Sequence, residues 1–210
     1  MKTRLTGIVA GIAAVAITGS AAWLGMQTPA TATTQAGAAD TDVTRYTIDP
    51  VHSSIVFRIK HLDTTYVYGR FNEMEGEFVL DAENLDQSRI EMEIAAESID
   101  TNNEDRDNHL RSPDFFNARE HSTLRFESER ITQNRQGVYR AHGDLTIHGR
   151  THSIDVDIEH TGESDSEQFG QRKGWKTTFT VDRMDYDVDY MPDGLGHDVE
   201  VTVSVQGIAE

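Results

Sequence analysis

The polar side chains best suited to chemistry gather in residues 98–116, where large aromatic side chains lie beside them. Arg106, Asp107 and His109 fall within four positions of one another. An arginine guanidinium can pair with a phosphate or a quinone oxygen of a bound molecule. Long connections that carry such groups tend to be functional rather than simple linkers. This segment is therefore the first candidate for a site.

Two further histidines, His52 and His61, extend the candidate set. His61 follows Phe57 and Ile59 at a period of two, which predicts that its ring points inward with them. A buried imidazole needs a hydrogen-bond partner, which Asp107 or an oxygen of a ligand would provide. Two roles stay open for the polar set, namely binding a ligand head group or anchoring residues 98–116 to the domain. The set comprises His52, His61, Arg106, Asp107 and His109.

Signatures of a metal centre or of an enzyme are weak. The chain has no cysteine, no Gly-x-Ser-x-Gly elbow and no phosphate-binding loop. His142, His148 and His152 could ligate zinc or copper. However, His142 and His148 share the outward face of an expected strand, where solvated surface histidines are the better interpretation. We therefore predict no metal, no cofactor and no catalytic residue.

The elements that must position these groups are β-strands, because apolar and polar residues alternate with a period of two along most of the chain. Ile55, Phe57 and Ile59, for example, oppose Arg58 and Lys60. Short polar turns join the strands, with a tight hairpin turn expected around residue 149. The strands are expected at residues 54–60, 68–81, 89–96, 123–128, 139–148, 153–160, 173–182 and 199–208.

One apolar and one charged face per strand favours an antiparallel sheet. Eight such strands close naturally into an up-and-down, lipocalin-like barrel, which removes exposed sheet edges. A barrel of this size is either filled by side chains or holds one small ligand. The predicted fold class is thus an all-β, eight-stranded antiparallel barrel, and a two-sheet sandwich is the alternative.

One short helix is expected, from Asn103 to Ser112, within the 102–117 connection. Asn102 or Asn103 can cap its start, and Pro113 stops it. The helix and the aromatic pair that follows it are expected to form a lid or plug over one end of the barrel.

The N-terminal part of the chain is typical of a targeting segment. Lys2 and Arg4 precede an uncharged run over residues 5–26, and small-residue cleavage sites follow. We predict a signal peptide over residues 1–32, a tail or linker over residues 33–44 and one folded domain over residues 45–210. The alternative is an uncleaved membrane anchor, because the uncharged run is long enough to span a bilayer. Either arrangement exports the domain.

The charge of the chain narrows its partners. The formal net charge is −17 at neutral pH, and such a surface repels nucleic acid and anionic lipid head groups. An exported domain without cysteine has no disulfides, so its core and its ladders must stabilise it alone.

Ordered motifs along residues 46–208 make the domain resemble the YceI-like proteins, which are exported lipocalin-like barrels that bind polyisoprenoid or related long-chain lipids. The motifs match in order and separation; they are Asp49-Pro-Val-His52-Ser53, Gly69-Arg70-Phe71, Arg106-Asp107-Asn-His109-Leu110, Ser112-Pro-Asp114-Phe-Phe116, Phe126-Glu-Ser128, Gly143 to Gly149 and Asp182-Arg183. The acidic stretch Asp185–Asp189 departs from the family pattern.

The resemblance implies a periplasmic protein that carries an isoprenoid or other long-chain lipid, a quinone-like molecule included, without catalysis. The alternative is a small lipid-acting hydrolase or isomerase that uses His61 and His109 in the same pocket. Transient membrane contact for lipid exchange and a homodimer are further partnerships that stay open. The expected tail-binding residues are Phe57, Ile59, Phe71, Phe78, Ile94, Leu110, Phe115, Phe116, Phe126, Leu145, Ile147 and Phe179.

Overall fold

A computed structural model describes residues 44–210 with the exception of residue 82. The expected signal peptide and nearly all of the expected linker lie outside the described residues. Within the described part of the chain, no helix combines the length and the apolar character that crossing a membrane would require.

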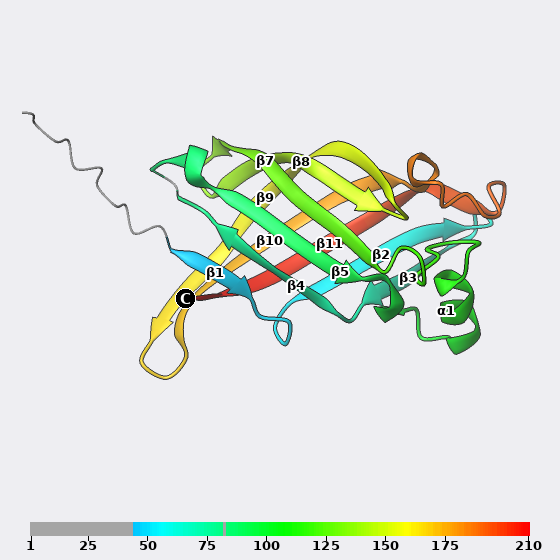
Figure 1. Cartoon of the computed structure of the whole chain (residues 1–210), viewed down its shortest axis with the longest axis horizontal. Coiled ribbons are helices and arrows are strands. Elements are labelled where there is room, and N and C mark those ends of the chain that lie inside the picture. Colours follow the sequence, from blue (N-terminus) through cyan, green and yellow to red (C-terminus); the bar gives the residue numbers. More distant parts are fainter. Residues whose placement is uncertain (1–43, 82) are drawn as a thin grey trace, which may run out of the picture. The chain divides into compact units, whose positions relative to one another are not determined.

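The described residues form one closed antiparallel barrel (Figure 1). Neighbouring strands follow the order β1-β4-β5-β7-β8-β9-β10-β11, and β11 pairs with β1 to close the ring. The strands are β1 (Arg45–Ile48), β2 (Ser54–His61), β3 (Thr65–Phe71), β4 (Met74–Val79), β5 (Arg89–Ala95), β6 (Ile99–Asp100), β7 (Thr123–Arg135), β8 (Val138–Ile147), β9 (Arg150–Ser166), β10 (Gly170–Asp182) and β11 (Leu195–Ala209). The expected all-β barrel is confirmed.

Eleven strands make an eight-stranded barrel because three of its eight strand positions are each occupied by two consecutive short strands. β11 pairs with β2 from Leu195 to Ser204 and with β1 through its last residues, so β1 and β2 together occupy one strand position of the barrel. In the same way β3 pairs with β2 and β6, whereas β4 pairs with β1 and β5. The prediction of a single strand over residues 68–81 was wrong, because residues 72–73 are not in a strand and separate β3 from β4.

The expected helix is confirmed as α1 (Glu104–Arg111), which lies at one end of the barrel in Figure 1. The side chain of Asn103 caps it, because its Oδ1 accepts a hydrogen bond of 2.9 Å from the backbone N–H of Arg106. Short 3₁₀ turns also occur at Leu85–Gln87, Ala96–Ser98 and Arg183–Tyr186. The expected hairpin turn between β8 and β9 is confirmed too, with positive φ at both His148 and Gly149.

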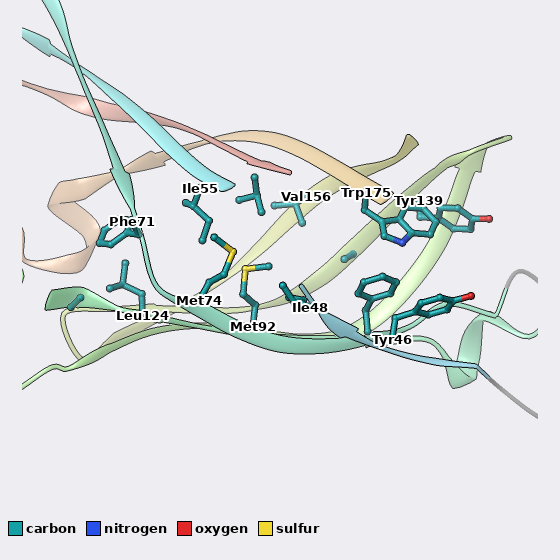
Figure 2. Packing of buried hydrophobic residues seen from close by; sticks show 14 of the residues in the cluster. Tyr46, Ile48, Ile55, Phe71, Met74, Met92, Leu124, Tyr139, Val156 and Trp175 are labelled. Atoms are coloured by element: carbon teal, nitrogen blue, oxygen red, sulfur yellow. The ribbon is translucent and has the colours of Figure 1, made fainter. Parts of the chain in front are cut away.

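Aromatic side chains close the end of the barrel opposite α1 (Figure 2). Tyr46 stacks on Phe78 with ring centroids 5.1 Å apart, and Trp175 meets Phe78 edge-on at 6.2 Å. Tyr139 also packs edge-on against Trp175, with ring centroids 5.7 Å apart. Because Tyr46 is only 1% exposed, this end of the barrel is a packed aromatic wall.

The turn between β1 and β2 depends on the Asp49 carboxylate. A hydrogen bond of 2.8 Å from His52, and further bonds from the Val51 N–H and the Gln206 amide, lower the pKa of Asp49. A carboxyl whose pKa is lower in the folded state stabilises the fold above its unfolded pKa of about 4. That stabilisation disappears as the pH falls through the folded value.

We therefore expect Asp49→Asn to lower the unfolding free energy at pH 6 and to flatten its decline below about pH 4. Urea unfolding at pH 6 and pH 3 measures both effects. Asp63→Asn, in the exposed β2–β3 turn, is the control. An Asp49→Asn curve parallel to that of the wild type would contradict the assignment.

Candidate functional site

An apolar cavity of about 490 Å³ lies inside the barrel. Inward-facing side chains of the strands form its walls, and side chains of α1 and of the segment that follows it line it too. All twelve residues expected to contact an apolar tail are in its lining, namely Phe57, Ile59, Phe71, Phe78, Ile94, Leu110, Phe115, Phe116, Phe126, Leu145, Ile147 and Phe179. Their contact with a lipid stays a prediction.

The cavity exists because the facing side chains do not fill the barrel. Phe57, Phe126 and Phe179 point inward and pack against the core, but part of the surface of each stays exposed because it faces the cavity. Gly69 makes room for one of these rings, because a Cβ atom at Gly69 would lie 2.3 Å from the Phe57 ring. The barrel is therefore hollow along its middle and closed at its aromatic end.

Aromatic side chains also narrow the end of the cavity at α1. Phe116 meets Phe71 edge-on at 5.7 Å, which brings the segment after α1 onto the barrel wall. His109, Phe115 and Tyr190 form a three-ring cluster with centroid separations of 4.9 to 5.1 Å. His109 is further held by Asp114, whose Oδ2 accepts from Nε2 at 2.9 Å. This cluster forms the rim of the cavity.

Arg106 and Asp107 hold α1 to the barrel through one residue, Thr101. The Asp107 carboxylate accepts hydrogen bonds from the Thr101 N–H, at 2.9 Å, and from its hydroxyl. Arg106 donates to the Thr101 hydroxyl and carbonyl oxygens, both at 2.7 Å. Asp107 is buried, whereas Arg106 is exposed at the cavity lining. Asp107 therefore anchors α1 to Thr101, whereas Arg106 both binds Thr101 and lies at the rim of the cavity.

Asp107→Ala is expected to lower the unfolding free energy by about 1.5 to 3 kcal/mol, because a buried N–H loses its charged acceptor. Asp105→Ala, on the exposed face of the same helix, should cost less than about 1 kcal/mol. Chemical denaturation of the two variants measures the difference. Equal losses would show that Asp107 contributes no more than an exposed acidic residue of the first turn.

The other two polar candidates lie in different places. His61 lines the cavity, as the alternation predicted. Of the two hydrogen-bond partners considered for His61, Asp107 is excluded, because both hydrogen bonds of its carboxylate come from Thr101. A hydrogen bond to an oxygen of a ligand stays a prediction. His52 belongs to the β1–β2 turn, where it binds Asp49 and has 65% of its side chain exposed. His52 is thus not among the residues that line the cavity.

The segment between β10 and β11 supplies lining residues that the sequence did not reveal. Arg183, Tyr186, Tyr190 and Met191 all line the cavity. Burial raises the pKa of Tyr186 to about 12, so its hydroxyl stays protonated. The available signal was the presence of two tyrosines and a methionine within an otherwise acidic stretch, which alternation alone does not detect.

Arg183 organises that segment from inside. Its guanidinium donates to the carbonyl oxygens of Gly196 at 2.9 Å, Tyr190 at 3.1 Å and Leu195 at 3.2 Å, and also to that of Val188. Only 5% of Arg183 is exposed. The Arg183 guanidinium thus binds backbone carbonyl oxygens, and these hydrogen bonds fix the loop that brings Tyr190 to the rim.

The histidines considered for a metal lie outside the cavity lining. His142 binds Asp155 at 3.1 Å, while His148 and His152 contact the carbonyl oxygens of Tyr186 and Asp185. Among residues 44–210 without residue 82, no group of three or more potential ligands is placed to hold a metal ion.

These features define a class: a closed eight-stranded antiparallel barrel, hollow and apolar within, with polar side chains at one rim. A family model described as a YceI-like domain matches residues 46–207. The chain belongs to the YceI-like family.

Curated relatives agree with this assignment. A UPF0312 protein of Vibrio cholerae serotype O1 (strain M66-2) is 34% identical over 165 residues, which are 78% of this chain and 86% of the relative. A UPF0312 protein of Ectopseudomonas mendocina is 34% identical over 178 residues, which are 84% of this chain and 91% of the relative.

Solved structures share the fold. BcnA of Burkholderia cenocepacia matches with a TM-score of 0.70 at 16% identity, over 76% of this chain and 98% of its own. The YceI protein of Campylobacter jejuni matches with a TM-score of 0.64 at 24% identity, over 72% of this chain and 89% of its own. A polyisoprenoid binding domain from Saccharophagus degradans matches with a TM-score of 0.61 at 13% identity, over 79% of this chain and 98% of its own.

Proposed function

We propose that this protein is a periplasmic carrier of an isoprenoid or other long-chain lipid and that it performs no catalysis. The observation that supports this most directly is the hollow, apolar barrel interior with polar side chains at its rim. A solved structure that shares the fold is described as a polyisoprenoid binding domain. A filled interior would instead have favoured a structural role.

The cavity suits a long hydrocarbon because burial supplies the affinity. A chain that transfers about 400 Å² of apolar surface into the cavity gains about 10 kcal/mol before the costs of ordering it. Arg106, His61 and His109 at the α1 end could bind a polar head group that reaches the rim. The tail would then contact the inward faces of β2, β7, β10 and β11.

Exposed apolar side chains at the α1 end support transient contact with a membrane. Leu62 at the β2–β3 tip is 54% exposed, and Tyr190 and Met191 are 42% and 38% exposed. The Leu62 N–H donates to Gly194 O at 2.8 Å, which joins the tip to the 190–195 loop. Large apolar side chains beside a cavity rim can enter the bilayer surface while lipid passes. The net charge of −17 would keep that contact brief.

Native mass spectrometry of protein purified from its own source tests the carrier function. We expect a mass above that of the polypeptide, with the added mass released in organic solvent as a lipid. Delipidated protein should then take up polyprenol from mixed vesicles in a one-to-one complex. A polypeptide-only mass, together with no uptake of any offered polyprenyl lipid, would overturn the proposal.

Export is tested separately on the full chain. The intact mass of protein released by osmotic shock should lack a segment ending near Ala30-Thr31-Ala32, as the signal peptide predicts. Retention in the membrane fraction with the full-length mass would favour the uncleaved anchor.

A further inference from the structure

Three buried polar atoms without hydrogen-bond partners lie together near the aromatic end of the barrel. They are the indole Nε1 of Trp175, the hydroxyl Oγ1 of Thr177 and the imidazole Nε2 of His160. Across residues 44–210 without residue 82, only two other side-chain atoms share this condition, the Nε atoms of Arg58 and Arg125. Those two guanidinium groups are bound through their other nitrogens. The unpaired atoms at Trp175 are therefore a local feature.

The strand register explains why these atoms come together. Trp175 on β10 lies opposite His160 on β9, and their ring centroids are 4.7 Å apart. Thr177 lies two residues further along β10, on the same inward face. Both Trp175 and Thr177 line the cavity, and Trp175 is only 7% exposed. Lys176 between them also borders the cavity, but the residue is exposed and the alternation places its side chain on the opposite face of the strand.

An unpaired buried donor is unfavourable, so native interiors seldom keep one without a reason. An apolar residue at position 177 would fill the same space without that cost. The cluster also closes the inner end of the cavity, where the far end of a bound molecule would arrive. A ligand atom that accepts from the Trp175 N–H and exchanges a hydrogen bond with Thr177 would relieve the cost.

We infer that the Trp175–Thr177 end of the cavity is a binding subsite for an uncharged oxygen-bearing group, a carbonyl or a hydroxyl, at the inner end of a long apolar ligand. This deepens the proposed carrier function and rests on it. Trp175 donates to the ligand oxygen, and the Thr177 hydroxyl donates or accepts once the neighbouring side chains part to admit it.

A charged group does not suit this subsite. Lys173 is occupied elsewhere, with its Nζ 5.5 Å from the Tyr46 ring centroid and 3.7 Å from Glu163. A phosphate at Trp175 would be buried without a cation, which is strongly unfavourable. The two ends of the cavity thus differ in chemistry, with cationic and imidazole groups at the rim and neutral hydrogen-bonding groups inside.

The test compares three ligands that share the same branched hydrocarbon chain, namely phytol, the hydrocarbon phytene and phytyl phosphate. Affinities are measured by displacement of a fluorescent lipid from delipidated protein. The change in tryptophan emission that is absent in Trp175→Phe reports contact with Trp175, because the chain also holds Trp23. Wild-type protein should bind phytol more tightly than phytene. Thr177→Val and Trp175→Phe should each weaken phytol binding about 3- to 10-fold, the effect of one hydrogen bond, and weaken phytene binding less.

Thr178→Val is the matched control, because Thr178 lies on the outer face and its hydroxyl contacts Thr202 at 3.0 Å. It should not alter the preference between phytol and phytene. Thr177→Val should also leave the melting temperature of the empty protein unchanged or higher, because its hydroxyl has no partner to lose.

Equal binding of phytol and phytene, or an equal loss of both in Thr177→Val, would overturn the subsite while the carrier function stands. Phytyl phosphate that binds more tightly than phytol and loses affinity in Thr177→Val would overturn the uncharged assignment. If none of the three ligands binds, the carrier function itself fails and the subsite with it.

Discussion

Val201→Trp is expected to abolish most long-chain lipid binding while leaving the barrel folded. Val201 lies in the middle of β11, opposite Phe57 on β2 and Phe179 on β10, and lines the cavity. An indole at this position would occupy the space between those rings. If it excludes about four methylene groups of a ligand, at about 0.8 kcal/mol each, affinity falls by about 3 kcal/mol, or roughly 200-fold.

The stability of this variant distinguishes occlusion from damage. An indole that enters empty apolar space adds buried surface, so the unfolding free energy should stay the same or rise. Thr202→Trp, at the next position on the outer face of β11, is the matched control and should bind lipid normally. Lipid titration and urea unfolding of both variants measure the effects. Val201→Trp protein that is stable and still binds lipid like the wild type would show that the tail lies elsewhere.

The barrel itself could be predicted from the sequence because its main determinant is local. Alternation of apolar and polar residues fixes which side chains face inward, and it does so without knowledge of strand partners. This is why every strand residue expected to bind the tail lies in the cavity lining. The helix was equally local, since the Asn103 cap and Pro113 mark its two ends.

The parts that the sequence did not reveal depend on contacts between distant residues. The break at residues 72–73 follows from pairing β3 and β4 with different neighbours, which no local pattern encodes. The partner of Asp107 was not predicted either, because its contact with Thr101 depends on where the helix lies against the barrel. The hollow interior is a similar case, since alternation shows which side chains face inward and not whether they fill the space between them.

Arg183→Met is expected to have the largest effect on stability of any single change at the rim. Arg183 is buried, and its guanidinium is the shared donor for four backbone carbonyls of residues 188–196. A methionine fills similar space but donates nothing, so carbonyl groups turned toward the interior lose their partner. Because hydrogen bonds from a charged group are worth about 1.5 to 3 kcal/mol each and some carbonyls can turn to water, we expect a loss of about 3 to 5 kcal/mol.

Arg183→Met should also change the rates of lipid release and uptake, because the loop that Arg183 holds carries Tyr190 and Met191 to the rim. A loosened loop should speed lipid release more than it slows uptake, which stopped-flow transfer to acceptor vesicles would measure. Arg150→Met is the control, since Arg150 is 61% exposed and binds Asp187 from the outside of the same segment. An exposed pair of that kind contributes about 1 kcal/mol or less. If both variants lose equal stability, the carbonyl cluster is not what fixes the loop, and its hold on the rim must come from the packing of Tyr186 and Tyr190.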